Sequence, residues 1–322
     1  MEQLAIELNA PSYKAGDLME GRLLLDLAAP TFVQDITLFI EGTEYSFWSK
    51  GSGKNRRTFS ETKTIFRNSI NLFENKDLQI GDVLSAKINA MFGQEREKTF
   101  DAGAYDAPFS FRLPNLLPAT IQTSSRSYIK YQITAVVNVP LGRDMKVVTP
   151  FYVYETQYVR RLKGVKQENE KHFWFNENTI EAKIELDQDV YFPNSVVKGT
   201  MLLTNHSSKE VEAIVVELAQ ICSLKAKSLK HDETTPTLLV RQSDLGIRQG
   251  RETEVSFDFR LPDGLQPSTE TGELVKVKYG MVFRLEIAWA MDMEIGLPVT
   301  ILGNHVEVSD DAIKKALFSQ RT

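Results

Sequence analysis

The sequence repeats itself, and this repeat constrains the fold more than any other feature of its 322 residues. The segment Ile6–Leu8 recurs as Ile184–Leu186, a shift of 178 positions. The same shift aligns four further pairs: Tyr13 with Tyr191, Gly21 with Gly199, Leu24–Leu25 with Leu202–Leu203, and Ile36–Ile40 with Ile214–Leu218. One constant shift over successive apolar segments predicts two copies of a single domain.

A second block repeats at a different shift. Phe109–Pro114 (FSFRLP) recurs as Phe257–Pro262 (FDFRLP), 148 positions later. The order of the blocks is the same in both copies, so the second copy is shorter by 30 residues between them. We therefore expect extra material in the first copy, between about Gly42 and Phe109.

Each copy has the pattern of β-strands. Apolar and polar residues alternate over Ile129–Val139, over Tyr279–Trp289 and over Asp35–Ile40, which is the period of a half-buried strand. Turn signals such as Pro262-Asp263-Gly264 separate such runs. Short strands with almost no amphipathic helix between them favour antiparallel sandwiches over βαβ units. We predict an all-β fold of two tandem, immunoglobulin-like β-sandwiches.

The predicted domains follow from these patterns. The first sandwich covers residues 1–157, a charged and aperiodic linker covers 158–172, and the second sandwich covers 173–308. Residues 309–322 form a predicted C-terminal helix or tail, in which Ser309 or Asp310 caps a short helix.

Composition excludes several classes of protein. The chain has 38 Lys+Arg, 43 Asp+Glu and a net charge of -5, which argues against a dedicated nucleic-acid binder. A single cysteine, Cys222, cannot form an internal disulfide and suggests a reducing compartment. No run approaches the roughly 18 apolar residues of a membrane span. We expect a cytoplasmic protein.

The sequence offers no pattern of residues for catalysis. The four histidines show no ligand spacing, and Cys222 follows an apolar run, where a buried hydrophobe is expected. Gly51–Asn55 resembles the end of a phosphate-binding loop but lacks the required preceding glycine and following Ser or Thr. We predict no catalytic residues, no cofactor, no metal site and no enzymatic activity.

The strongest functional signal is a local cluster of positive charge. Lys50, Lys54, Arg56 and Arg57 lie within eight positions, beside Trp48. Such a loop can engage phosphate, acidic lipid headgroups or an acidic peptide, and a solvated hairpin tip without a ligand is the alternative.

Several blocks together resemble the arrestins, and most closely the α-arrestin (arrestin domain-containing) branch. Tyr13–Leu25 and Tyr105–Pro114 are similar to strands of that family's N-domain, and Gly296–Gly303 (GLPVTILG) is similar to the close of its C-domain. The resemblance implies a bilobed, non-catalytic scaffold. It also places Lys14 near the phosphate-binding basic residues of the visual/β-arrestin branch.

The implied function is that of an adaptor in protein transport, endocytosis or signalling, which is recruited from the cytoplasm to the plasma membrane or endosomes. Its expected partners are cytoplasmic tails of membrane receptors or transporters, together with trafficking or ubiquitination machinery. The sequence has no two adjacent prolines, so ligase recruitment through a Pro-Pro-x-Tyr motif is not expected of these residues. A retromer-like endosomal coat subunit and a module that binds anionic lipid remain alternatives.

Overall fold

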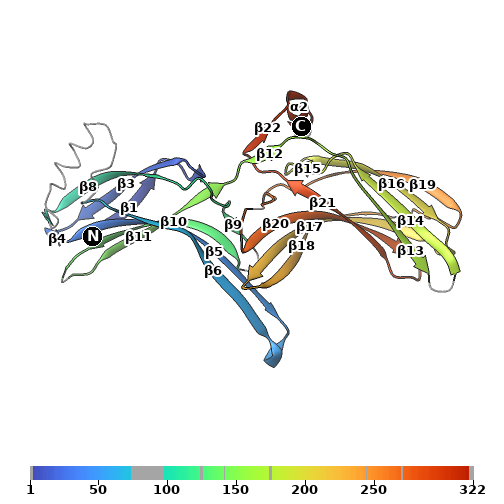
Figure 1. Cartoon of the computed structure of the whole chain (residues 1–322), viewed down its shortest axis with the longest axis horizontal. Coiled ribbons are helices and arrows are strands. Elements are labelled where there is room, and N and C mark those ends of the chain that lie inside the picture. The colour runs from blue at the N-terminus through green and yellow to red at the C-terminus, as the bar shows by residue number, and fades with distance from the viewer. Residues whose placement is uncertain are drawn as a thin grey trace. The chain divides into compact units, whose positions relative to one another are not determined.

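The computed structural model describes residues 3–73, 98–123, 126–140, 142–173, 176–243, 245–269 and 271–318 (Figure 1). The chain divides into two compact units. The first comprises residues 1–155, 225–228 and 271–275, and the second comprises 156–224, 229–270 and 276–322. Two sets of mainly antiparallel sheets thus confirm the predicted all-β, two-sandwich class.

The first unit contains a three-stranded sheet in the order β1-β3-β8 and a six-stranded sheet in the order β2-β11-β10-β5-β6, with β9 paired to β10. A short β4–β7 pair completes it. Its strands are β1 (Gln3–Leu8), β2 (Ser12–Lys14), β3 (Leu18–Leu27), β4 (Thr31–Val33), β5 (Asp35–Lys50), β6 (Arg57–Asn71), β7 (Lys98–Phe100), β8 (Gly103–Arg112), β9 (Ile121–Gln122), β10 (Tyr128–Asn138) and β11 (Met145–Tyr154).

The second half of the chain repeats this arrangement, with an additional strand at the edge of one sheet. One sheet has the order β13-β14-β16-β19, another has the order β15-β21-β20-β17-β18, and β12 pairs with β22. The strands are β12 (Gln157–Val159), β13 (Val165–Phe173), β14 (Asn176–Leu186), β15 (Val190–Tyr191), β16 (Val196–Asn205), β17 (Val211–Ala226), β18 (Leu229–Gln242), β19 (Arg251–Arg260), β20 (Val275–Ile287), β21 (Met293–Ile301) and β22 (Val306–Val308).

Equivalent tyrosines show that the two copies share detailed hydrogen bonding as well as strand order. The Tyr131 hydroxyl donates to the Pro118 carbonyl at 2.6 Å, and the Tyr279 hydroxyl donates to the Gln266 carbonyl at 2.8 Å. Both pairs of positions are 148 residues apart between the copies. The shift of 148 positions found in the sequence therefore also relates equivalent hydrogen bonds, each from a tyrosine hydroxyl to a main-chain carbonyl, in the two copies.

Alternation explains why these segments form the core. In β20, Val277, Tyr279, Met281 and Phe283 are buried, whereas the residues between them are half-buried or exposed. A period of two sends one set of side chains between the sheets and the other set outward. The sandwich therefore buries a continuous apolar layer, as the sequence pattern predicted.

The extra residues of the first copy fall in two places. The connection from β6 to β8 takes 31 residues, whereas the matching connection from β18 to β19 takes 8. The turn from β5 to β6 takes six residues, against two between β17 and β18. Residues 74–97 of the longer connection lie outside the described part of the chain.

The segment predicted as an aperiodic linker, 158–172, contains most of β12 and of β13 instead. β13 pairs with β14, and Lys166–Glu185 and Lys183–Glu168 form ion pairs directly across this ladder. Residues 166–170 are all exposed, so the strand has no apolar face. Main-chain pairing with β14 and the cross-strand ion pairs stabilise this strand. Neither interaction requires apolar residues at alternate positions, so the sequence shows no hydrophobic pattern here.

The predicted C-terminal helix is present as α2 (Asp311–Phe318). Asp310 caps it, because its Oδ1 atom accepts a hydrogen bond from the Ala312 N–H at 2.6 Å. Leu317 is buried against Val159, Phe192 and Leu302, so the helix docks on its own unit. No helix within the described ranges is long and apolar enough to cross a bilayer.

One buried carboxylate stands out in the first unit. Glu44 is 1% exposed, and its Oε1 atom accepts hydrogen bonds from the N–H groups of Leu274 and Val275 at 2.7 and 2.8 Å. Buried polar groups require such partners because the interior cannot hydrate them. Glu44 therefore ties the segment 271–275 into the first unit.

Candidate functional site

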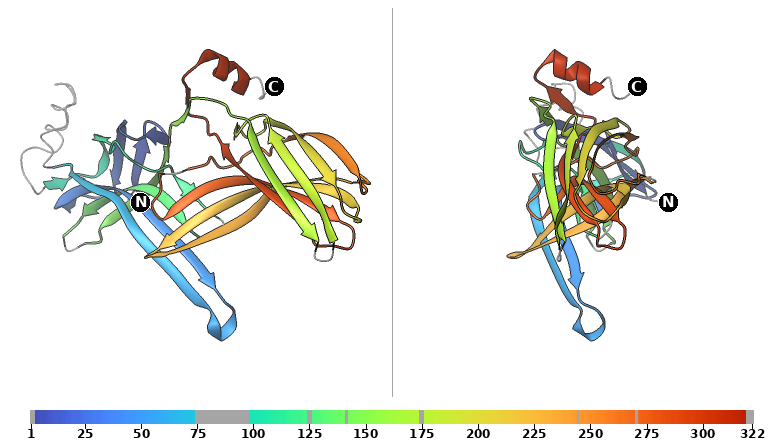
Figure 2. Two further views of the ribbon diagram at one scale, coloured as in Figure 1. Left: turned by 45° about the vertical axis from the view of Figure 1, so that its right-hand side comes forward. Right: turned by 90° about the vertical axis from the view of Figure 1, so that its right-hand side faces the viewer.

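A long hairpin of the first unit presents the predicted basic cluster. β5 and β6 pair from Thr37 opposite Asn71 up to Lys50 opposite Arg57, with one irregularity between Gly42 and Thr43. The hairpin, blue in Figures 1 and 2, extends beyond the other strands of its sheet. The residues at its end are therefore held away from the body of the sheet.

The turn itself depends on glycine. Gly51 and Gly53 have φ values of +85° and +53°, which side chains with a Cβ atom adopt only with strain. A Cβ atom on Gly51 would also come within 2.7 Å of the Asn55 carbonyl oxygen. A single 3₁₀ turn over Gly53–Asn55 closes the loop.

The structure brings four of the five predicted site residues together. Lys50, Lys54, Arg56 and Arg57, here called the basic tip, are all exposed. Within the described part of the chain, none of these four side chains forms an ion pair. The tip therefore presents four uncompensated positive charges to solvent, which is a suitable surface for an anionic ligand.

The aromatic neighbour of the tip has a structural role. Trp48 lies opposite Phe59, and the two rings stack at a centroid distance of 5.4 Å and an angle of 19°. Trp48 is only 4% exposed. Trp48 therefore packs within the stem of the hairpin. Its position beside the basic cluster in the sequence suggested a ligand contact, but the buried indole is not accessible to a ligand.

Lys14 lies elsewhere. It ends β2, which pairs with β11 at the opposite edge of the sheet from β6. The Lys14 side chain is half-buried, and the main-chain N–H of Lys14 donates a hydrogen bond to the Asp17 carboxylate at 2.7 Å. The structure therefore does not place Lys14 with the basic tip.

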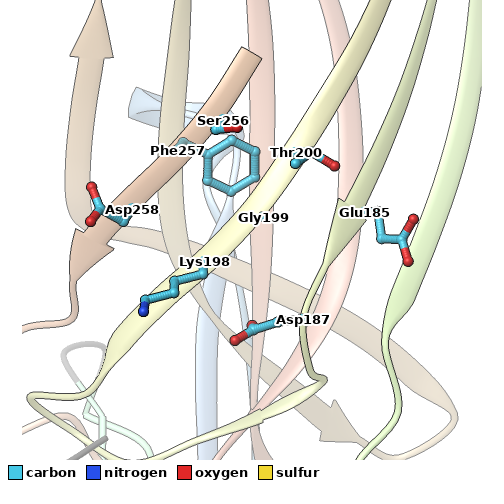
Figure 3. Close-up of a pocket in the computed structure, with 8 residues that line it drawn as sticks. All are labelled: Glu185, Asp187, Lys198, Gly199, Thr200, Ser256, Phe257 and Asp258. Carbon is cyan, nitrogen blue, oxygen red and sulfur yellow. The ribbon is translucent and has the colours of Figure 1, made fainter. Parts of the chain in front are cut away.

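A shallow depression of about 660 Å³ lies on the outer face of the sheet β13-β14-β16-β19 (Figure 3). Glu185, Asp187 and Asp258 line it, with Lys198 among them. Burial raises the pKa of Asp187, although its carboxylate also accepts a hydrogen bond from the Tyr191 hydroxyl at 3.0 Å. Asp187 thereby helps to fix the β15 turn, and the depression contains neither histidine nor cysteine.

The groups capable of chemistry lie apart. His172 faces Glu170 at 3.6 Å, and His206 faces Glu181 at 3.8 Å, each on an exposed surface. Cys222 is buried, and burial raises the pKa of its thiol to about 11, so it is protonated at neutral pH. Among the residues that the structure describes, no three His, Cys, Asp or Glu side chains form a metal-binding group.

Comparison with protein families agrees with the two-unit fold. The family model described as "Arrestin (or S-antigen), N-terminal domain" matches residues 4–159. The model described as "Arrestin (or S-antigen), C-terminal domain" matches residues 176–306. These matches fall on the two repeats, one on each.

Named relatives are similar at low identity. Arrestin domain-containing protein A of Dictyostelium discoideum is 25% identical over 310 residues, covering 92% of this chain and 50% of the relative. Arrestin domain-containing protein 17 of Caenorhabditis elegans is 22% identical over 300 residues, covering 89% and 68%. Human arrestin domain-containing protein 5 is 21% identical over 327 residues, covering 94% and 89%.

The chain spans about half the length of the Dictyostelium relative and most of the human one. The likeness extends over both repeats, with the same order of N-terminal and C-terminal domains. By these matches, which together cover nearly all of its residues, this protein belongs to the arrestin family.

Proposed function

We propose that this protein is a non-catalytic, cytoplasmic adaptor that binds the cytoplasmic regions of membrane proteins in endocytic trafficking or signalling. Membership of the arrestin family supports the scaffold role, because adaptors without catalysis are typical of that family. The basic tip supports the choice of an anionic partner. It is the end of a paired hairpin and carries four exposed cations.

The tip suits recognition by charge more than recognition by shape. Its cations lie on a projecting turn, and all of residues 50–58 are exposed. Charges of this kind attract acidic or phosphorylated segments over about 8 Å in physiological salt, and the attraction weakens as salt rises. An acidic cytoplasmic tail is the partner that this surface favours.

The first test is affinity purification from the native cell. We expect membrane cargo or sorting components to co-purify with the full chain. Recovery of soluble metabolic enzymes alone would contradict the adaptor role. A co-purified partner that forms a stable, stoichiometric complex on a sizing column would instead favour the coat-subunit alternative.

The second test asks whether the tip makes the contact. Reversal of Lys54, Arg56 and Arg57 to glutamate should reduce cargo recovery at least tenfold, because it changes the local charge by six. A matched control changes another exposed basic run by the same amount, at Arg160, Arg161 and Lys163. If both variants lose cargo equally, net charge and not the tip governs binding.

Anionic lipid is the second candidate ligand, and the same exposed cations favour it. Each Lys or Arg near an anionic bilayer contributes about 1 kcal/mol, so four cations would contribute about 4 kcal/mol. Vesicles of phosphatidylcholine with and without phosphatidylserine test this role. If vesicle binding is unchanged when all four cations of the tip are reversed to glutamate, the lipid-binding role of the tip is contradicted.

A further inference from the structure

A groove follows one edge of the second unit, where its two sheets end. β18 is the last strand of one sheet and β19 is the last strand of the other. Apolar side chains line most of the groove between them: Ile214, Val216, Val240, Val255, Phe257 and Phe259. Its volume of about 250 Å³ is below the roughly 300–1,000 Å³ of small-molecule sites. It has room for a few side chains.

The two flanking strands differ in how well they can accept another strand. β19 pairs only with β16 among the described strands, so the main-chain groups on its other side have no ladder partner. Residues 251–260 contain neither proline nor glycine. β18 carries Pro236, which has no N–H to donate and interrupts strand pairing. The free edge of β19 is therefore the one open to strand addition.

Exposed acids outnumber exposed bases along β19, with Glu252, Glu254 and Asp258 against Arg251 and Arg260. Glu252 and Glu254 are exposed, on the outer side of β19. Their neighbours across the ladder, Thr204 and Leu202, carry no positive charge. In the described ranges of the chain, neither glutamate forms an ion pair. An added strand with cations at its outward positions would supply the missing opposite charges.

We propose that the free edge of β19 and the groove between β18 and β19 bind an extended segment of a partner protein in which apolar residues alternate with lysine or arginine. The strand period of two directs the apolar side chains toward Val240 and Phe257 and the basic side chains toward Glu252 and Glu254. This site lies wholly in the second unit. It does not depend on what the basic tip binds.

The test uses the full chain and a fluorescent nine-residue peptide of alternating lysine and valine. Fluorescence polarisation should show saturable binding, and a peptide of alternating glutamate and valine should bind at least tenfold more weakly. Hydrogen exchange should slow in residues 251–260 when the lysine peptide is bound. Absence of binding, or protection confined to other strands, would overturn the proposal.

Two variants separate the groove from simple charge attraction. Val240→Asp places a charge in the groove and should weaken binding at least tenfold. Glu252→Lys with Glu254→Lys should reverse the preference between the two peptides without touching the core. The matched control reverses Glu7 and Glu20, two exposed acids of the first unit. An equal loss of binding in that control would show non-specific attraction and reject the site.

Discussion

Gly199 lies directly opposite Phe257 in the antiparallel pair of β16 and β19, and a Cβ atom on Gly199 would come within 2.6 Å of the Phe257 Cζ atom. The first unit has the same relationship between Gly21 and Phe109, also at 2.6 Å. The glycines are related by the shift of 178 and the phenylalanines by the shift of 148. In each copy, this contact joins a residue of the first repeated block to a residue of the second. Both copies keep the contact, although the chain between the two blocks differs in length by 30 residues.

This contact predicts the effect of Gly199→Ala. The new methyl group would also come within 2.5 Å of the Glu185 carbonyl oxygen, and a backbone atom cannot yield as a flexible side chain can. We expect a loss of about 1–3 kcal/mol, typical of overpacking, measured by urea unfolding.

The matched control for that variant is Gly296→Ala, in β21. No atom lies within 4 Å of the added Cβ there, so the change should stay within about 0.5 kcal/mol. Phe257→Leu in the Gly199→Ala background should recover part of the loss. Equal stability of the two alanine variants would show that the close approach at Gly199 does not constrain the fold.

Glu44→Ala should destabilise the first unit by at least about 2 kcal/mol, because it leaves two buried N–H groups, those of Leu274 and Val275, without acceptors. Glu44→Gln keeps one carbonyl oxygen and should lose less. The exposed Glu20→Ala is the control, and chemical denaturation is the measurement. If Glu44→Ala and Glu20→Ala have the same unfolding midpoint, the buried hydrogen bonds contribute nothing to stability.

Docking of α2 can be tested by two substitutions. Leu317→Ala removes a side chain that is 1% exposed and should cost about 2–3 kcal/mol. Asp310→Ala removes the helix cap and should cost about 1 kcal/mol. Lys315→Ala, at an exposed position, is the control. A midpoint unchanged by Leu317→Ala would mean that the helix does not pack in solution.

Stability should fall at alkaline pH. Burial raises the pKa of the Cys222 thiol to about 11 and that of Tyr279 to about 12. As pH rises, the unfolded chain therefore releases these protons before the folded chain does, at about pH 8.5 for cysteine and about pH 10 for tyrosine. The folded state is fully favoured below those values and loses stability as pH rises through them.

The melting temperature should accordingly decline between pH 8.5 and pH 11, and less steeply in Cys222→Ala. The native thiol should also resist alkylation by iodoacetamide at pH 8 and react after unfolding in urea. Rapid alkylation of the native protein would contradict the burial of Cys222.

The sequence predicted the parts of the fold that bury one face of a strand. The alternation in Ile129–Val139 and Tyr279–Ile287 corresponds to β10 and β20, since such a strand must place apolar residues at every second position. Trp289, which continues the pattern in the sequence, lies beyond the end of β20 and is 95% exposed. β13 was missed for the opposite reason. Its residues 166–170 are exposed on both faces, so hydrophobic alternation could not mark it.

The candidate sites divide in the same way. The sequence by itself determined the repeat, the strand chemistry and the presence of Lys50, Lys54, Arg56 and Arg57 in one turn, because these depend on residues close together in the chain. Only the tertiary structure decided that this turn ends a projecting hairpin, that Lys14 lies at the opposite sheet edge, and that β18 and β19 border a groove. Strand order within a sheet is set by pairing between distant segments, and hydrophobic alternation, which is a local pattern, does not specify it.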